Sequence, residues 1–119
     1  MTAERLPKSS RVTRASELRA LMTQGKRHRT GHLDLFTRPS PVGSSRLAVI
    51  VPRFAFTAVR RNRLRRRLRE IGRREVLPVL PEPTDVAVRA RASAYAVPFI
   101  TLRSELVGSL CPRSPDSAS

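Results

Sequence analysis

The sequence has one cysteine, no tryptophan, one tyrosine and four phenylalanines among its 119 residues. A single cysteine, Cys111, excludes an internal disulfide and a cage of thiolate metal ligands, and we expect it to be a lone, half-buried thiol. The longest uncharged stretch, 92–102, contains Pro98 and is too short to cross a bilayer. No apolar segment follows the basic N-terminus, so we expect no secretory signal. These absences favour a small cytoplasmic protein that has no membrane partner.

Acidic residues are also scarce, with nine Asp and Glu against 24 Lys and Arg, which gives a formal net charge of +15. The few carboxylates do not converge: Glu70 and Glu75 lie about 140° apart around an α-helix, so we expect that they cannot share a metal site. His28 and His32 have only Asp34 as a nearby carboxylate in the sequence. No glycine-rich phosphate loop is present. The sequence therefore predicts no catalytic residue, no metal site and no small-molecule substrate.

The length fits one domain, and a compact domain of such high positive charge typically has a polyanion as its partner. We expect a flexible basic arm over 1–11, a single nucleic-acid-binding domain over 12–111 and a disordered tail over 112–119. The apolar and turn patterns predict, in order, a helix over 14–24 between Thr13 and the cap residue Gly25, a basic turn over 26–29, a strand over 32–38, a central strand over 46–51, a helix over 57–75, a proline-rich loop over 77–84, a strand over 85–91 and a helix from Pro98 to Leu110. This order, α-β-β-α-β-α with or without one further strand, predicts the α+β fold class as a two-layer α/β sandwich.

Apolar spacing marks the faces that we expect to be buried. Leu33 and Leu35 share one face of their strand, and Phe36 lies on the other face. The last helix carries an apolar stripe made of Phe99, Leu102, Leu106, Val107 and Leu110. These stripes predict one core between the helices and the sheet.

Seven arginines occur in the ten residues 60–69, RRNRLRRRLR. At about 100° per residue, Leu64, Leu68 and Ile71 share one face, which we expect to be buried. A second stripe lies nearly opposite, flanked by Arg63 and Arg65, and consists of Asn62, Arg66, Arg69 and Arg73. Guanidinium groups stay charged and fork onto phosphate oxygens, whereas Asn62 can read a sugar, a base edge or a bound water.

The alternative for this helix is a solvated face held by ion pairs, but only Glu70 and Glu75 are available as partners. The imbalance favours polyanion binding. The basic pattern alone does not separate RNA from DNA or from an acidic protein.

The stretch AVRRNRLRRRLRE, residues 58–70, resembles the signature of the protein subunit of bacterial ribonuclease P. The resemblance extends over about 6–110 and includes the first helix and the strands 33–36, 46–51 and 85–91. The segment 52–57 departs from the family pattern, with Phe56 where a glycine is usual and Thr57 as the helix N-cap.

The resemblance implies a ribosomal protein S5 domain 2-like fold with a left-handed βαβ crossover, which is the rarer hand. It implies a subunit that partners a catalytic RNA, ribonuclease P RNA, and promotes removal of the 5′ leader of precursor tRNA. In this family the RNA and Mg²⁺ perform the hydrolysis, so we expect Mg²⁺ to be held mainly by the RNA and no cofactor to be bound by the protein alone.

The resemblance also implies site residues. Together with the arginine stripe, it gives an expected RNA-binding set of Arg53, Arg61, Asn62, Arg63, Arg65, Arg66, Arg69 and Arg73. A groove for the single-stranded leader would be lined by Leu18, Met22 and Phe36, of which Phe36 fits the core equally well, whereas Leu21 fits the core better. Two other interpretations remain: a structural RNA-binding protein of ribosomal type, and a basic-helix DNA binder, which the lack of a heptad zipper disfavours.

Overall fold

The structure is a computed structural model that describes residues 10–12, 14–53 and 57–110. Its main elements are α1 (Ala15–Gln24), β1 (Lys26–Arg29), β2 (Leu33–Pro39), β3 (Arg46–Ile50), α2 (Ala58–Ile71), β4 (Thr84–Ala90) and α3 (Phe99–Leu110). This order confirms the predicted α+β class, with β1 as the one further strand. The predictions for residues 1–9, Thr13, Phe56, Cys111 and the tail over 112–119 lie outside the described residues.

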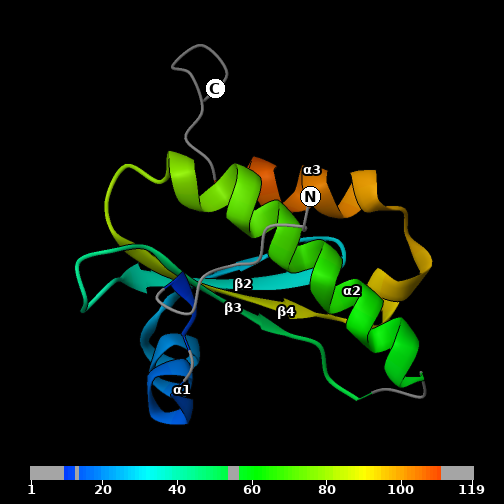
Figure 1. Cartoon of the computed structure of the whole chain (residues 1–119), viewed down its shortest axis with the longest axis horizontal. Helices are drawn as coiled ribbons and strands as arrows, with labels where there is room; N and C mark the ends of the chain where they lie inside the picture. The colour runs from blue at the N-terminus through cyan, green and yellow to red at the C-terminus, as the bar shows by residue number, and fades with distance from the viewer. Residues whose placement is uncertain (1–9, 13, 54–56, 111–119) are drawn as a thin grey trace, which may run out of the picture.

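The four strands form one mixed sheet with the order β1-β2-β4-β3. β1 pairs antiparallel with β2, β2 pairs antiparallel with β4, and β3 pairs parallel with β4. In Figure 1, α2 and α3 lie above the sheet and α1 lies below it. The chain therefore crosses from β3 through α2 to the parallel neighbour β4, as the resemblance implies. The left hand of this crossover stays a prediction.

Alternation along the strands produces two apolar clusters, one on each face of the sheet. On the face covered by α2 and α3, Leu33, Leu35 and Val88 are fully buried. On the face covered by α1, Phe36 packs with Leu21. This arrangement confirms the prediction that Leu33 and Leu35 lie on one face of their strand and Phe36 on the other. It also explains how β2 and β4 can be apolar on both faces, because both strands lie inside the sheet.

Two predictions about the sheet were wrong. Residues 26–29 are not a turn but the strand β1, which pairs with β2 from Lys26 opposite Thr37 to Arg29 opposite Asp34. All four residues are basic or histidine, a composition that suits an edge strand because charge there discourages pairing with another chain.

β3 is at the other end of the strand order rather than in the centre. Its apolar residues are needed on both faces because Leu47 contacts one cluster and Ala48 the other. Its outer side is partly covered, since Arg11 forms a parallel bridge with Leu47 and the Val12 amide donates to the Leu47 carbonyl at 3.0 Å.

α2 begins as predicted, with the Thr57 side chain accepting a hydrogen bond from the Arg60 amide at 3.3 Å. The helix then widens into a π-helical turn, η2 (Gly72–Val76), where the Leu77 amide donates to the Gly72 carbonyl. The glycine at position 72 makes room for the Leu47 side chain, because a Cβ there would lie 2.5 Å from Leu47 Cδ2 and the leucine would have to shift. A short 3₁₀ turn, η3 (Leu77–Val79), leads into the predicted proline loop.

In the last helix, the first residue of α3 is less buried than predicted. α3 buries Leu102 and Leu106 completely, and a 3₁₀ turn, η4 (Ala92–Ala96), precedes it. Phe99 is 37% exposed, so its place in the buried stripe was wrong. The reason is its position at the start of the helix, beside the end of α2, where the core gives way to a surface cavity.

Candidate nucleic-acid interface

α2 is anchored to the sheet by its apolar face. Leu64, Leu68 and Ile71 are 4%, 0% and 1% exposed, as the spacing predicts. Asn62 and Arg66 are exposed on the outer face. The helix therefore presents its basic side chains outward on a fixed support.

Contacts within the outer face order several of these side chains. Arg65 Nη1 donates to Asn62 Oδ1 at 2.8 Å, and Arg73 pairs with Glu70. Arg69 is half-buried, and this burial, together with the positive charges of Arg11 and Arg65, lowers the pKa of Arg69 from its ordinary value. An anion bound beside Arg69 would relieve that repulsion.

The other members of the expected RNA-binding set also lie on or next to α2. Arg53 and Arg63 are exposed, whereas Arg61 is half-buried. The structure thus brings the whole set to α2, its π-helical continuation and the segment before it. Their contacts with RNA remain predictions.

The sequence analysis assigned no binding role to the basic residues on the side of α2 that faces η4 and α3. The Arg60 guanidinium lies 5.6 Å from the centroid of the Tyr95 ring, which is cation–π distance. Arg67 and Arg74 are exposed. These residues could have been found from their helical spacing. Arg60, Arg63 and Arg67 form a third basic row beside the apolar face of the helix.

The predicted leader-groove residues lie together on the opposite face of the sheet. Leu18 and Met22 of α1 are half-buried and pack against the cluster that contains Phe36. Phe36 itself is 5% exposed, and the Arg27 guanidinium lies 5.8 Å from its ring centroid. The Phe36 ring is therefore part of the core, and its role as the floor of a groove stays a prediction. Leu21 is fully buried, as expected.

An ion cluster holds α1 beside this surface. Arg46 of β3 contacts Glu17 of α1 at 3.1 Å and Asp85 of β4 at 2.7 Å. Hydrogen bonding from Arg46 lowers the pKa of Glu17, so this carboxylate is ionised in neutral solution. The cluster fixes the start of α1 to two strands.

Asp34 is the carboxylate near His32 in the sequence, but the fold adds a second one from a distant segment. α3 brings Glu105 to this histidine, with Oε2 at 3.7 Å from His32 Nε2 and Oε1 accepting from the His32 amide at 2.8 Å. His32 Nδ1 also lies 2.8 Å from Ser93 Oγ. In the part of the chain that the structure describes, there is no group of three His, Cys, Asp or Glu residues that could hold a metal ion. Nor does any described helix combine the length and apolarity needed to span a membrane.

Residues 6–111 match the family model for ribonuclease P. The chain belongs to the ribonuclease P protein family. A ribonuclease P protein component from Desulfovibrio desulfuricans is 35% identical over 86% of this chain and 81% of its own length. One from Acidothermus cellulolyticus is 33% identical over 84% of each chain.

Solved structures agree. The ribonuclease P protein from Thermotoga maritima superposes with a TM-score of 0.74 and 30% identity, covering 84% of this chain and 94% of that one. The protein from Staphylococcus aureus, at 20% identity and a TM-score of 0.71, supports the fold. Ribonuclease P proteins are subunits of a ribonucleoprotein endoribonuclease, so the polyanion partner is RNA. The family match therefore favours this interpretation over a ribosomal-type structural protein or a DNA binder.

Proposed function

We propose that this chain binds the catalytic RNA of ribonuclease P and the 5′ leader of precursor tRNA, and thereby promotes endonucleolytic 5′ maturation of tRNA in the cytoplasm. The proposal is supported above all by one observation: α2 exposes Asn62 and Arg66 on the side opposite Leu64 and Leu68, which are buried. A rigid basic face of this kind fits the phosphates of a folded RNA.

The mechanism that we propose is electrostatic and geometric. Arginines on α2 neutralise phosphates of the catalytic RNA and release counterions, which gives a strongly salt-dependent affinity. Because the helix is packed onto the sheet, its guanidinium groups keep a fixed spacing. The leader-groove residues lie on the other face of the same sheet, so the protein can bridge the catalytic RNA and the leader.

For the leader, the exposed parts of Leu18 and Met22 offer an apolar wall, and Arg27 beside Phe36 offers a charge for a phosphate. Neither α1 residue is aromatic, so stacking on bases contributes less here than the roughly 1–3 kcal/mol per base of an aromatic platform. We therefore expect the groove to hold the leader mainly through its backbone.

The hydrolysis itself is assigned to the RNA. Mg²⁺ prefers several oxygen ligands, and the described residues do not gather three carboxylates or histidines at one place. We propose that the RNA holds the metal ions and that the protein raises their apparent affinity by neutralising phosphates nearby. No side chain of this chain is given a catalytic role.

Reconstitution tests the proposal. The full chain is added to a bacterial ribonuclease P RNA with a precursor tRNA at low Mg²⁺, and leader cleavage is followed by gel electrophoresis. We expect the cleavage rate to rise and the Mg²⁺ requirement to fall. An unchanged rate over a range of Mg²⁺ concentrations would refute the proposed function.

The leader groove has its own control. The affinity of the complex for precursor tRNA is compared with its affinity for the same tRNA without a leader. Tighter binding of the precursor is expected, and the difference should shrink when Met22 is replaced by Asp, which puts a negative charge beside the leader. Equal affinities would show that the groove assignment is wrong while leaving RNA binding by α2 intact.

A further inference from the structure

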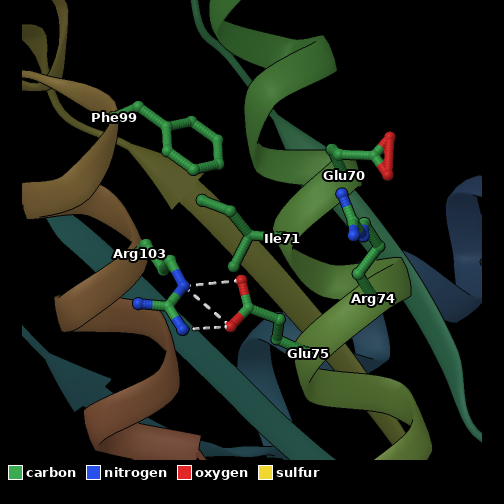
Figure 2. Close-up of a pocket in the computed structure, with 6 residues that line it drawn as sticks. All are labelled: Glu70, Ile71, Arg74, Glu75, Phe99 and Arg103. Atoms are coloured by element: carbon green, nitrogen blue, oxygen red, sulfur yellow. Dashed lines mark hydrogen bonds and ion pairs between the residues drawn. The ribbon is translucent and has the colours of Figure 1, made fainter.

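A cavity of about 390 Å³ lies between the end of α2, η2 and the start of α3. Its six lining residues are Glu70, Ile71, Arg74, Glu75, Phe99 and Arg103. Figure 2 shows Phe99 on the α3 side of the cavity, Glu70 and Arg74 on the α2 side, and Ile71 between them. The cavity thus combines an aromatic ring with carboxylates and guanidinium groups.

Glu70 and Glu75 both line this cavity. The prediction that they cannot share a metal site concerns metal binding, which the cavity does not test, and it stays a prediction. Glu75 belongs to η2, in which the chain makes an i to i+5 hydrogen bond, so each turn holds more residues than in an α-helix. In Figure 2 the Glu75 carboxylate points toward Arg103 of α3, whereas the Glu70 carboxylate lies on the α2 side. Such π-helical turns are frequent at functional sites.

The charges in the cavity are already partly balanced. Arg103 Nε donates to both oxygens of Glu75 at 2.7 Å, and these bonds lower the pKa of Glu75. Arg73 contacts Oε1 of Glu70, and a carboxyl group has room for several hydrogen bonds. Arg74 is exposed at the α2 side. The cavity therefore presents carboxyl oxygens, an aromatic ring and a positive charge to an incoming ligand.

We propose that this cavity binds a guanine base that is unstacked from a single-stranded segment of RNA. The ring of Phe99 stacks on the base, Glu70 accepts hydrogen bonds from the base edge, and Arg74 contacts the adjoining phosphate. The site rests on the proposed function, because it assumes that the partner of α2 is RNA.

Three features favour this ligand. Phe99 is 37% exposed, so one part of its ring is open to stacking. Guanine carries adjacent N–H donors on its Watson–Crick edge that match a carboxylate, whereas adenine at that edge offers one donor group beside an acceptor. The net charge of +15 repels a basic peptide, which would otherwise suit two carboxylates and an aromatic ring.

The position of the cavity on the helix also fits. Arg67 is exposed and lies one turn before Glu70 on the same side of α2, and Arg63 lies one turn before Arg67. A strand that follows Arg63 and Arg67 along the helix would arrive at the cavity with its phosphates already contacted. The third basic row of α2 and the cavity therefore form one continuous surface.

The test uses the full chain, isotopically labelled, and four RNA pentamers that differ only at the centre: UUGUU, UUAUU, UUCUU and UUUUU. Binding is followed by NMR chemical shifts. We expect UUGUU to bind about tenfold more tightly than UUAUU, the size expected for an added charge-assisted hydrogen bond. The largest shifts should occur at the Phe99 ring and at Arg74.

Two variants and one control assign the contacts. Phe99→Leu keeps an apolar side chain and should weaken UUGUU binding about fivefold through lost stacking. Glu70→Gln should remove most of the preference for UUGUU over UUAUU. Ile100→Leu, at the neighbouring and 57% exposed position, should change neither affinity. Each side chain is at least partly exposed, so the fold should survive, and the amide spectrum checks this.

Equal affinities for the four pentamers, or an unchanged affinity in Phe99→Leu, would overturn the guanine site. If the chain activates a ribonuclease P RNA but shows no base preference, the site is wrong and the proposed function stands. If it prefers UUGUU but activates no ribonuclease P RNA, the proposed function is wrong and the base site stands.

Discussion

Arg46 and Asp85 are direct partners in the parallel pairing of β3 with β4, and their side chains meet in a buried, two-pronged ion pair. Arg46 Nε donates to Asp85 Oδ1 at 2.9 Å, and Nη2 donates to Oδ2 at 2.7 Å. The two side chains are 8% and 1% exposed. Since Glu17 also binds Arg46, one guanidinium ties the start of α1 to the two strands at the end of the sheet.

Removing Asp85 should be strongly destabilising. Asp85→Ala leaves the Arg46 charge buried with only Glu17 as its carboxylate in this cluster, and breaking a buried pair in this way typically lowers the free energy of unfolding by about 3–5 kcal/mol. Urea denaturation followed by circular dichroism measures the loss. Glu82→Ala, at an exposed loop position, is the control and should change stability little. A loss below about 1 kcal/mol in Asp85→Ala would contradict this account.

The stability of the fold should fall in acid partly through Glu17. Its pKa in the folded state is lowered from the ordinary value of 4.5, first by the hydrogen bond from Arg46. A group whose pKa is depressed by folding stabilises the protein above its unfolded pKa, and this stabilisation is lost as the pH falls through the folded pKa. Glu17→Gln should therefore flatten the pH dependence of the free energy of unfolding below about pH 4.5, whereas Glu82→Gln should not. Parallel curves for Glu17→Gln and the unsubstituted chain would rule the effect out.

The sequence predicted most of the helical framework because the relevant signals are local. In α2, the spacing of Leu64, Leu68 and Ile71 is sufficient to orient the helix, and the hydroxyl of Thr57 is sufficient to start it. The direction of Asn62 then follows from helix geometry. The basic face could thus be placed without knowledge of the sheet.

Features that depend on distant pairing could not be predicted. β1 has no apolar alternation, and only its pairing with β2 reveals it as a strand. Glu105 reaches His32 across 73 positions, and the cavity beside the end of α2 adjoins a π-helical turn that no local pattern indicated. The apolar residues of β3 indicate that both faces of the strand are covered. They do not indicate whether the strand lies at the edge of the sheet or in its centre, because both faces can be covered at either position.

Gly25 illustrates a correct prediction with a different cause. It caps α1, but its φ is −73°, a value that any residue adopts. Glycine is needed because a Cβ would lie 2.3 Å from the Leu21 carbonyl oxygen and 2.9 Å from that of Thr37. Gly25→Ala should thus lower the free energy of unfolding by about 1–3 kcal/mol through overpacking against backbone.

The matched control for Gly25→Ala is Gly108→Ala in α3, where an added Cβ would meet nothing within 4 Å. This second change should be neutral or stabilise the protein by up to about 1 kcal/mol, because alanine is the better helix former. Thermal unfolding of both variants provides the comparison. Equal shifts in Tm would mean that close packing is not what requires glycine at position 25.

Arg66 should make a phosphate contact with ribonuclease P RNA, because it is exposed on the outer face of α2, opposite Leu64 and Leu68, which are buried. Each phosphate neutralised by the protein adds about 0.7–0.9 to the slope of log affinity against log salt concentration. Arg66→Ala should lower that slope by this amount and weaken binding at low salt. Arg19→Ala, an exposed change on α1 with the same loss of charge, controls for net charge and should alter the slope less. The measurement is filter binding of the RNA over a range of salt concentrations. If Arg66→Ala keeps both the slope and the affinity of the unsubstituted chain, the outer face of α2 does not bind the RNA at this position.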